Sequence, residues 1–187
     1  MAAEQGVTII YDDTSVKAGL SALSRRLKNM RPVYRVISEI MKEAVDSNFV
    51  AEGARGGHAK WKPLAFATRL GRLNRKMGRG KSIYLKRKQA GRFGLRKKAL
   101  RMMAPGGIKI LQDTGRLRRS CAAGTSFNRY QASVGSDLVY ARIHQLGGKA
   151  GKGVTIPARP YLFLVSSDLV EIEATIADML IAEWDRA

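Results

Sequence analysis

The stretch YARIHQLGGKAGKGVTIPARPYLFL, residues 140–164, concentrates the features on which the fold depends. Tyr140 and His144 are four residues apart, so they share one face of a short helix that the following glycine pair ends. Two prolines flank Arg159 and restrict the chain there to an extended path. The stretch therefore predicts one or two helical turns, a glycine-rich loop over 147–153, and an extended segment that holds Arg159 in a fixed place.

Amphipathic helices are predicted on both sides of this stretch. Two apolar repeats near the N-terminus indicate helices that meet at Pro32, the first of them capped by Asp13 or Thr14. A third repeat, near the C-terminus, indicates a helix capped by Ser167. The apolar positions are Val16, Leu20, Leu23, Leu27 and Met30 in the first helix, Val33, Val36, Ile37, Ile40, Met41, Ala44, Val45 and Phe49 in the second, and Leu169, Ile172, Ile176, Met179 and Leu180 in the third.

The strand signals are short. A β-branched run at 7–11 predicts a strand, 108–120 suits a short strand, a turn and a helical or extended piece, and 121–136 predicts a hairpin with Asn128 near its middle. Adjacent amphipathic helices need a surface to cover. We therefore expect an α+β fold: a small antiparallel or mixed sheet packed against the N-terminal helices and a C-terminal helix, in a single domain over 1–187.

The charge is distributed unevenly around a formal net charge of +19. Residues 1–53 are neutral overall, whereas residues 54–160 hold 26 basic and two acidic side chains. Residues 161–187 hold six acidic side chains and one basic one. A surplus of this size favours a polyanion or an acidic protein surface as a partner.

The densest basic run, residues 69–101, holds 14 lysines and arginines and no acid. Its glycines interrupt any long helix, although Leu70, Leu73 and Met77 predict one short helix. We interpret residues 69–107 as an inserted basic arm, or long loop, that contacts DNA or an acidic partner. The contact residues expected in it are Arg72, Arg75, Lys76, Arg79, Lys81, Lys86, Arg87, Lys88, Arg92, Arg96, Lys97 and Lys98.

The sequence offers no convincing set of catalytic or metal-binding residues. His58, His144 and Cys121 lack the spacing of a metal site. A nucleophile at Cys121 would need a histidine and an orienting carboxylate, whereas acids are nearly absent from this part of the chain. The loop 147–153 has no Ser or Thr after Lys152, unlike a phosphate-binding loop. We therefore expect no enzyme activity, no cofactor and no metal.

The chain also carries no sign of secretion or of a membrane span. Its single cysteine excludes an internal disulfide, which suits a reducing compartment. The N-terminus lacks the charged start and apolar run of a signal peptide, and no apolar stretch approaches the roughly 20 residues that cross a bilayer. We expect a soluble protein of a cytoplasm.

The order of several short motifs is more specific than any single motif. HAKWKPLA, ILQDTGRLRRS, ASVGSDLVYARIHQLGG and IPARPYL follow one another from residue 58 and precede the acidic C-terminal helix. This order resembles the phage virion morphogenesis family, the Mu-like and tail-completion proteins of the head–tail junction. The matching residues are Trp61, Pro63, Leu111, Gly115, Leu117, Ser120, Val134, Gly135, Ser136, Tyr140, Ala141, Ile143, His144, Gln145, Gly147, Pro157, Arg159, Pro160 and Leu162.

The resemblance implies a non-enzymatic virion protein that completes tails and helps to join them to heads. It implies a homo-oligomeric ring, often six-fold, with other neck, head-completion, tail-tube or sheath proteins as partners and no membrane contact. The location implied is the head–tail junction of the virion, after assembly in the host cytoplasm. The long arm departs from the family pattern, in which this segment is shorter. The residues expected at a subunit or partner interface are Trp61, Tyr140, His144, Gln145, Arg159 and Tyr161.

Two questions stay open at the level of sequence. Arg159 pairs either with an acid of its own subunit or with one across a subunit boundary, and the second is favoured because a ring needs such anchors. Composition alone also supports a nucleic-acid-binding basic protein that uses the arm at 69–101 on DNA or rRNA. Against that class, only Tyr84 and Phe93 are interleaved with the basic residues, and no zinc-finger or RNA-recognition signature is present. Genomic DNA remains a candidate partner of the arm.

Overall fold

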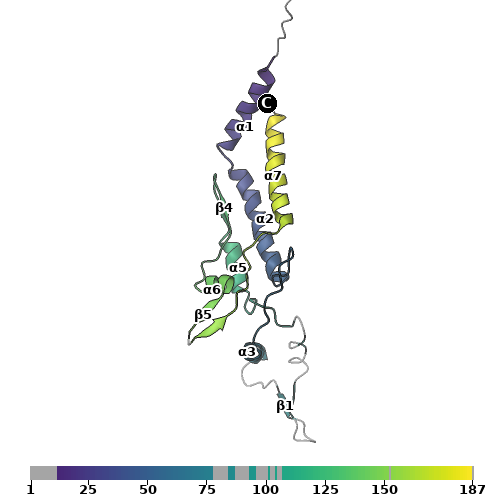
Figure 1. The fold of residues 1–187 in the computed structure, drawn as a ribbon, viewed down its shortest axis with the longest axis vertical. Helices are drawn as coiled ribbons and strands as arrows, with labels where there is room; N and C mark the ends of the chain where they lie inside the picture. The colour runs from purple at the N-terminus through teal and green to yellow at the C-terminus, as the bar shows by residue number, and fades with distance from the viewer. Residues whose placement is uncertain are drawn as a thin grey trace, which may run out of the picture.

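Three long helices set the shape of the molecule. A computed structural model describes residues 12–77, 84–86, 93–95, 101, 104, 107–151 and 153–186. Helices α1 (Thr14–Leu27) and α2 (Arg31–Val50) follow one another along the long axis, and α7 (Ser166–Trp184) lies beside both of them (Figure 1). The described part of the chain is therefore elongated.

The helix boundaries follow local chemistry. Helix α2 begins at Arg31 with Pro32 in its first turn, which confirms the predicted break between the first two helices. Asp13, one of the two expected residues, is the N-cap of α1, although its side chain makes no capping bond, and the Asp12 carboxylate accepts the backbone N–H of Thr14 at 3.0 Å. At α7 the Asp168 carboxylate accepts the backbone N–H of Val165 at 3.0 Å, while Ser167, the expected cap, is exposed in the first turn.

The N-terminal helices cover another helix where a sheet was expected to be their main support. Both α1 and α2 pack against α7. The predicted stripe of α2 is largely correct, since Val33, Ile37 and Phe49 are among its buried residues. Val36 was wrongly assigned to this stripe, because its side chain is 47% exposed.

The strands form antiparallel pairs, and the predicted α+β class is confirmed. Within the described residues they make three separate hairpins, and the pair β3–β4 packs against α2. Residues 147–153, interpreted as a loop, contribute a strand, and 108–115 forms turns without the expected strand. The strand predicted at 7–11 lies outside the described residues. The pairs are β1 (Tyr84–Lys86) with β2 (Phe93–Leu95), β3 (Ser126–Phe127) with β4 (Ala132–Ser133), and β5 (Gly148–Ala150) with β6 (Val154–Ile156).

Three shorter helices complete the described elements: α3 (Phe66–Met77), α5 (Arg116–Ala123) and α6 (Ala141–Leu146). Helix α3 confirms the short helix predicted at the start of the basic arm. Helix α6 confirms the helical turns predicted from Tyr140. Helix α5 takes up the first residues of the segment interpreted as a hairpin, so that hairpin starts only at Ser126, and the side chain of Asn128 organises its turn through the N–H groups of Tyr130 and Gln131.

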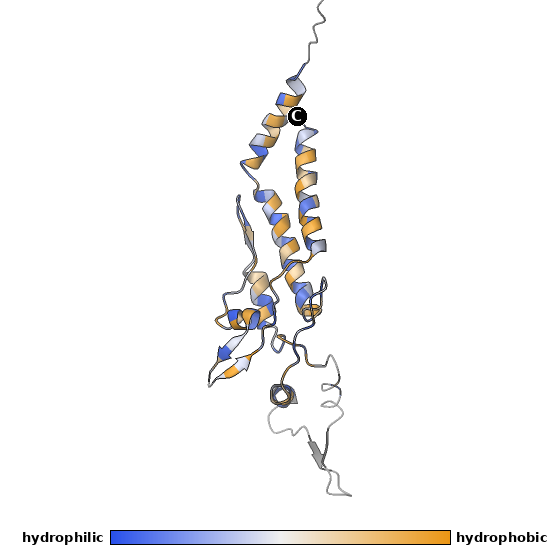
Figure 2. Ribbon diagram, viewed as in Figure 1, coloured by the Kyte–Doolittle hydropathy of each residue, from blue (hydrophilic) through white to orange (hydrophobic). Residues whose placement is uncertain are grey.

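The hydrophobic core lies at one end of the long helices. Phe49 is completely buried there, with the ring of Trp61 at 5.8 Å and that of Tyr161 at 5.2 Å between centroids. We call this end the base: the C-terminal half of α2 with residues 51–65 and 107–168. The opposite end, made of α1 and residues 169–184 of α7, is called the stalk, and apolar residues recur along both of its helices (Figure 2).

Candidate interaction surfaces

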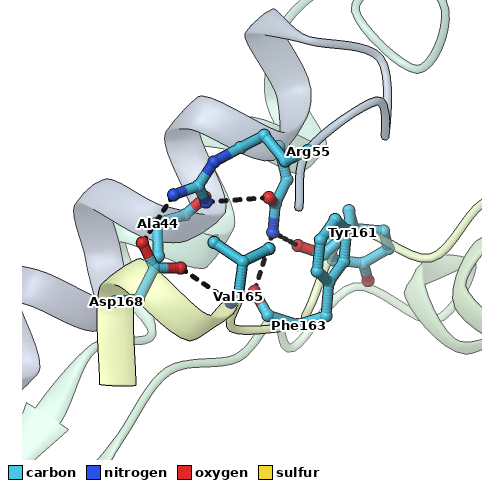
Figure 3. Close-up of polar contacts among 7 residues, drawn as sticks. Ala44, Arg55, Tyr161, Phe163, Val165 and Asp168 are labelled. Atoms are coloured by element: carbon cyan, nitrogen blue, oxygen red, sulfur yellow. Dashed lines mark hydrogen bonds and ion pairs between the residues drawn. The ribbon is translucent and has the colours of Figure 1, made fainter. Parts of the chain in front are cut away.

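A buried polar network joins α2 to the start of α7 (Figure 3). The Asn48 side-chain amide donates to the carbonyl oxygens of Tyr161 at 3.0 Å and Phe163 at 2.9 Å. Arg55 donates to the side-chain oxygen of Asn48 at 3.0 Å, and its other terminal nitrogen lies 2.5 Å from the Asp168 carboxylate. Asn48 is 0% exposed, so these contacts meet the requirement that buried polar groups have partners.

The segment 157–165 is held from its other side by two further side chains. Gln145 of α6 accepts the N–H groups of Tyr161 at 2.9 Å and Leu162 at 3.0 Å, and it donates to the Leu162 carbonyl at 3.2 Å. The indole N–H of Trp61 donates to the carbonyl oxygen of Pro160 at 2.7 Å. This segment, called the strap from here on, is therefore fixed by contacts within its own chain.

Gly147 allows the strap to pass close to α6. Its φ angle is 75°, a left-handed value that glycine adopts without strain. A Cβ at this position would lie 2.7 Å from the backbone nitrogen of Ala158 in the strap. The glycine that was predicted to end the helix thus also makes room for the segment that carries Arg159.

Arg159 is an internal residue and not an exposed anchor. The side chain is 5% exposed and donates to the carbonyl oxygens of Lys62 at 3.1 Å and Pro63 at 3.4 Å. Within the described part of the chain no ion pair to an acid is formed by Arg159. The expected ion pair with an acid of its own subunit is therefore not formed among the described residues, while a pairing across a subunit boundary stays a prediction.

The other residues expected at an interface divide into two groups. Trp61 and Tyr161 are 5% and 1% exposed and belong to the core, so their polar and apolar contacts lie inside the subunit. Tyr140 is 39% exposed, and its ring meets that of His144 edge to face at 5.8 Å on one side of α6, as their spacing predicted. A role of these residues between subunits stays a prediction, and Tyr140 is the one best placed for it.

His144 borders a small recess next to the basic arm. The recess has a volume of about 130 Å³, and Arg72, Asp113 and Tyr140 contribute to its lining. Burial lowers the pKa of His144, and the positive charges of Arg159 and Arg72 lower it further. The Nδ1 atom of His144 is buried without a hydrogen-bond partner in the described structure. The imidazole is therefore held in its neutral form in a positively charged setting.

The start of the basic arm is attached to the base. Arg72 donates to the Lys109 carbonyl oxygen at 2.9 Å, and Arg75 pairs with Asp113 at 2.5 Å. Lys76 is exposed on α3, and Lys86 ends strand β1. The other basic residues expected to contact DNA or an acidic partner lie outside the described residues: Arg79, Lys81, Arg87, Lys88, Arg92, Arg96, Lys97 and Lys98.

Cys121 and the possible metal ligands were the candidates for chemistry among the described residues. Burial raises the pKa of the Cys121 thiol to about 11, so the thiol is protonated at neutral pH. No group of three or more His, Cys, Asp or Glu side chains that could hold a metal occurs among the described residues. None of the described helices combines the length and apolarity that a membrane crossing needs.

Sequence reasoning missed the residues that organise the base. Asn48 falls on the buried stripe of α2, four residues after Ala44, and a polar residue on such a stripe is the signal that could have found it. Glu52 is similarly buried and accepts the backbone N–H of Ile110 at 2.9 Å. Asp46 and Arg118 form a two-pronged ion pair between α2 and α5 for which the sequence gives no signal.

Comparison with known proteins places these features in a family. A model described as the phage virion morphogenesis family matches residues 94–181. The chain is also similar to the "Mu-like prophage FluMu G protein 2" of Haemophilus influenzae, with 30% identity over 171 residues, covering 90% of this chain and 91% of that protein. The chain belongs to the phage virion morphogenesis family. No solved structure matches it.

Family membership makes the chain a bacteriophage virion morphogenesis protein. It implies a structural role in the virion rather than a catalytic one. The range matched by the family model contains α5, α6, the strap and most of α7. Gln145, one of the residues of the resemblance in this range, is hydrogen-bonded to the strap. Trp61 precedes the range, although its indole contacts the strap directly.

Proposed function

We propose that this virion morphogenesis protein completes the phage tail and joins it to the head as a homo-oligomeric ring. Family membership and the order of motifs from Trp61 to Leu162 support the tail and the head–tail junction as its place of work. Partners at that place are further copies of the chain and other neck, head-completion, tail-tube or sheath proteins.

The observation that carries the ring is a pair of apolar helix faces left uncovered in the stalk. The base buries Phe49, Trp61 and Tyr161 at its centre, whereas Leu20 and Leu27 of α1 are each 57% exposed, Val170 of α7 is 62% exposed and Ile181 is 58% exposed. Apolar helix faces of this extent are covered in stable assemblies. A chain that is basic over 54–160 and acidic over 161–187 also offers opposite charges to another copy of itself.

A deletion of the gene in the phage or prophage that encodes the chain tests this function. We expect normal heads and tails that remain separate, seen by electron microscopy, and a loss of infectious particles that the wild-type gene restores. Purified protein added to the lysate should restore joining. A deletion lysate with the usual number of joined, infectious particles would reject the proposed function.

The number of subunits is tested on the particle. The family resemblance suggests six subunits, so the assembled ring should have six times the subunit mass of 20.6 kDa. Mass photometry of purified protein and subunit averaging in images of tails measure this number. A discrete ring of another size would keep the tail-completion role and correct the symmetry, whereas a monomer on the tail would reject the ring.

The basic arm was expected to contact either an acidic protein partner or DNA. The net charge of +19 favours DNA as a second candidate partner. About six phosphate contacts would lower the affinity for duplex DNA about 10³-fold between 50 and 200 mM salt. The matched variant replaces residues 79–100 by a short Gly-Ser linker and retains α3, whose Arg72 and Arg75 contact the base. Equal binding and equal salt dependence of the two proteins would show that the arm does not contact DNA.

A further inference from the structure

Helix α1 carries a line of apolar side chains to one side of its contact with α7. Leu20 and Leu27 in this line are each 57% exposed. The contact with α7 uses other residues, because a Cβ on Gly19 would lie 2.7 Å from the indole ring of Trp184, and Ala22 is buried. At about 100° per residue, Gly19 and Ala22 lie roughly a quarter turn from the line. We call the line the α1 stripe: Val16, Leu20, Leu23 and Leu27.

Helix α7 carries a matching line on the face opposite to its own packing contacts. Ile172, Ile176 and Met179 on its inner side are partly buried. On the outer side Val170 is 62% and Ile181 is 58% exposed. A surface helix that is apolar on two faces is expected to have partners on both. We call the outer line the α7 stripe: Val170, Ala174, Ala177 and Ile181.

The two stripes have the same geometry. Each has four residues at intervals of four, three and four, so each is about 17 Å long at a rise of about 1.5 Å per residue. This spacing is that of the a and d positions of a coiled coil, in which a line of apolar side chains on one helix packs between those of another. The large leucines of the α1 stripe suit the alanines at the centre of the α7 stripe.

The charges on the two helices are opposite. Helix α1 contains Lys17, Arg25 and Arg26 and no acid, whereas the 19 residues of α7 contain five acids and no base. Two of the three bases are already paired within the subunit, Lys17 with Asp13 at 2.8 Å and Arg26 with Glu183 of α7 at 3.7 Å. Glu173 flanks one side of the α7 stripe, and Asp178 flanks the other. Among the described residues neither of these two acids forms an ion pair. Pairing of α1 with a second α1, or of α7 with a second α7, would bring like charges together.

We propose that the α1 stripe of one subunit docks on the α7 stripe of the next subunit. The inference rests on the ring of the proposed function and assigns the surfaces that form it. The two surfaces differ, so the contact is head to tail: every subunit keeps one free stripe of each kind until the ring closes. A single pair of helices buries less than the roughly 800 Å² per partner of a standard interface. Closure of the ring strengthens the assembly, because each subunit then makes the contact twice, once with each neighbour.

Mixing two defective variants tests the proposed contact in solution. The first variant, Leu20→Glu with Leu27→Glu, loses the α1 stripe, and the second, Val170→Lys with Ile181→Lys, loses the α7 stripe. All four side chains are more than half exposed, so both variants should keep the wild-type circular dichroism and melting temperature. Each variant alone should be a monomer. The mixture should form a dimer of twice the 20.6-kDa subunit mass and nothing larger, because it holds one intact stripe of each kind.

A control variant and the opposing outcomes complete this test. Ser21→Glu adds a negative charge to α1 on its exposed side away from the stripe, and it should form the wild-type ring. Rings from either stripe variant alone, dimers of one variant with itself, or a mixture that stays monomeric at concentrations well above those at which the wild-type ring forms would each overturn the proposed pairing. Self-dimers of the α7 variant in particular would point to an α1–α1 contact.

Cross-linking in assembled virions decides the contact at its place of work. A chain with Leu20→Cys and Ala177→Cys should give a ladder of covalent multimers on mild oxidation, since Cys121 is buried and does not compete. The pair Ser21→Cys with Ala177→Cys is the control and should give no ladder.

No ladder from the stripe pair, or a disulfide to a different virion protein, would overturn the proposal. Intact joining of heads and tails by both stripe variants would reject the contact alone. A ladder from the stripe pair, together with normal joining of heads and tails when the gene is deleted, would reject the proposed function alone.

Discussion

The base and the stalk are built in different ways. In the base, Asn48, Arg55 and Asp168 form a network of hydrogen bonds inside the chain, with the side chain of Asn48 completely buried. In the stalk, α1 contacts α7 through Gly19 against Trp184 and an ion pair of Arg26 with Glu183, and it leaves two leucines more than half exposed. The base therefore specifies its own structure, while the stalk presents surface that suits a neighbour.

The difference assigns different expected effects to substitutions. In the base a change of one polar residue leaves buried partners without hydrogen bonds, which lowers the stability of the isolated subunit. In the stalk a change of an exposed apolar residue should leave the subunit stable and affect assembly. Substitutions in each region should show where the boundary between these behaviours lies.

The largest effect on stability is expected from Asp168→Ala. The substitution leaves Arg55, whose side chain is 21% exposed, without its carboxylate, and the backbone N–H of Val165 without its acceptor. Loss of one member of a largely buried ion pair should lower the free energy of unfolding by about 3 kcal/mol. Urea denaturation measures it. Glu173→Ala on the exposed side of the same helix should change stability by less than about 0.5 kcal/mol; equal effects of the two variants would contradict the contrast.

A smaller loss is expected from Gln145→Ala. The backbone N–H groups of Tyr161 and Leu162 would lose their acceptor, at about 1 kcal/mol each, so stability should fall by about 2 kcal/mol. Thermal and urea unfolding measure the change. Arg142→Ala, an exposed substitution on the same helix, is the matched control and should be neutral. A neutral Gln145→Ala would show that water replaces the amide and that the strap is less enclosed than its contacts indicate.

The elements were predictable from sequence where the signal was local. The apolar spacing of α2, the break at Pro32, and the helix ended by Gly147 were each visible in a few neighbouring residues. The packing was less predictable, because period alone shows which face is apolar and not what covers it. The stripe of α2 was expected to cover a sheet, and α7 covers much of it.

The sequence pointed to the residues of the candidate site, but it did not predict the contacts that they make. The motif order identified Gln145, Arg159 and Tyr161 as special, and the structure places all three on the strap or against it. Their contacts join residues up to about 100 positions apart, such as Arg159 with Lys62, and no local pattern encodes such a pairing. A preset extended backbone suggested an exposed anchor, whereas burial of the guanidinium depends on the tertiary fold.

Gly19→Leu is expected to have a moderate effect and to separate the stalk from the base. A side chain at Gly19 would meet the ring of Trp184, since even a Cβ would lie 2.7 Å from it. Displacement of Trp184 should cost about 1–2 kcal/mol and shift tryptophan emission to longer wavelength, with Trp61 unchanged in the core. Gly71→Ala is the matched control: its Cβ meets nothing within 4 Å, and this helical position should gain about 0.5–1 kcal/mol. Unchanged emission in Gly19→Leu would show that α1 does not rest on Trp184.

The smallest effect expected is a change in the pH dependence of stability at His144. Its pKa lies below the ordinary value of 6.5, mainly through burial, so the unfolded chain takes up a proton at a higher pH than the folded chain does. The free energy of unfolding should therefore decrease as the pH falls through about 6.5 towards the folded-state pKa. Urea unfolding at pH 7.5 and 5.5 measures this difference, and His144→Gln should reduce it. His58→Gln, at an exposed ring, should leave the wild-type difference in place. If His144→Gln kept the full wild-type difference in stability between the two pH values, the recess beside Tyr140 would be open to water. The recess would then be an exposed surface of the molecule and not part of the enclosed base.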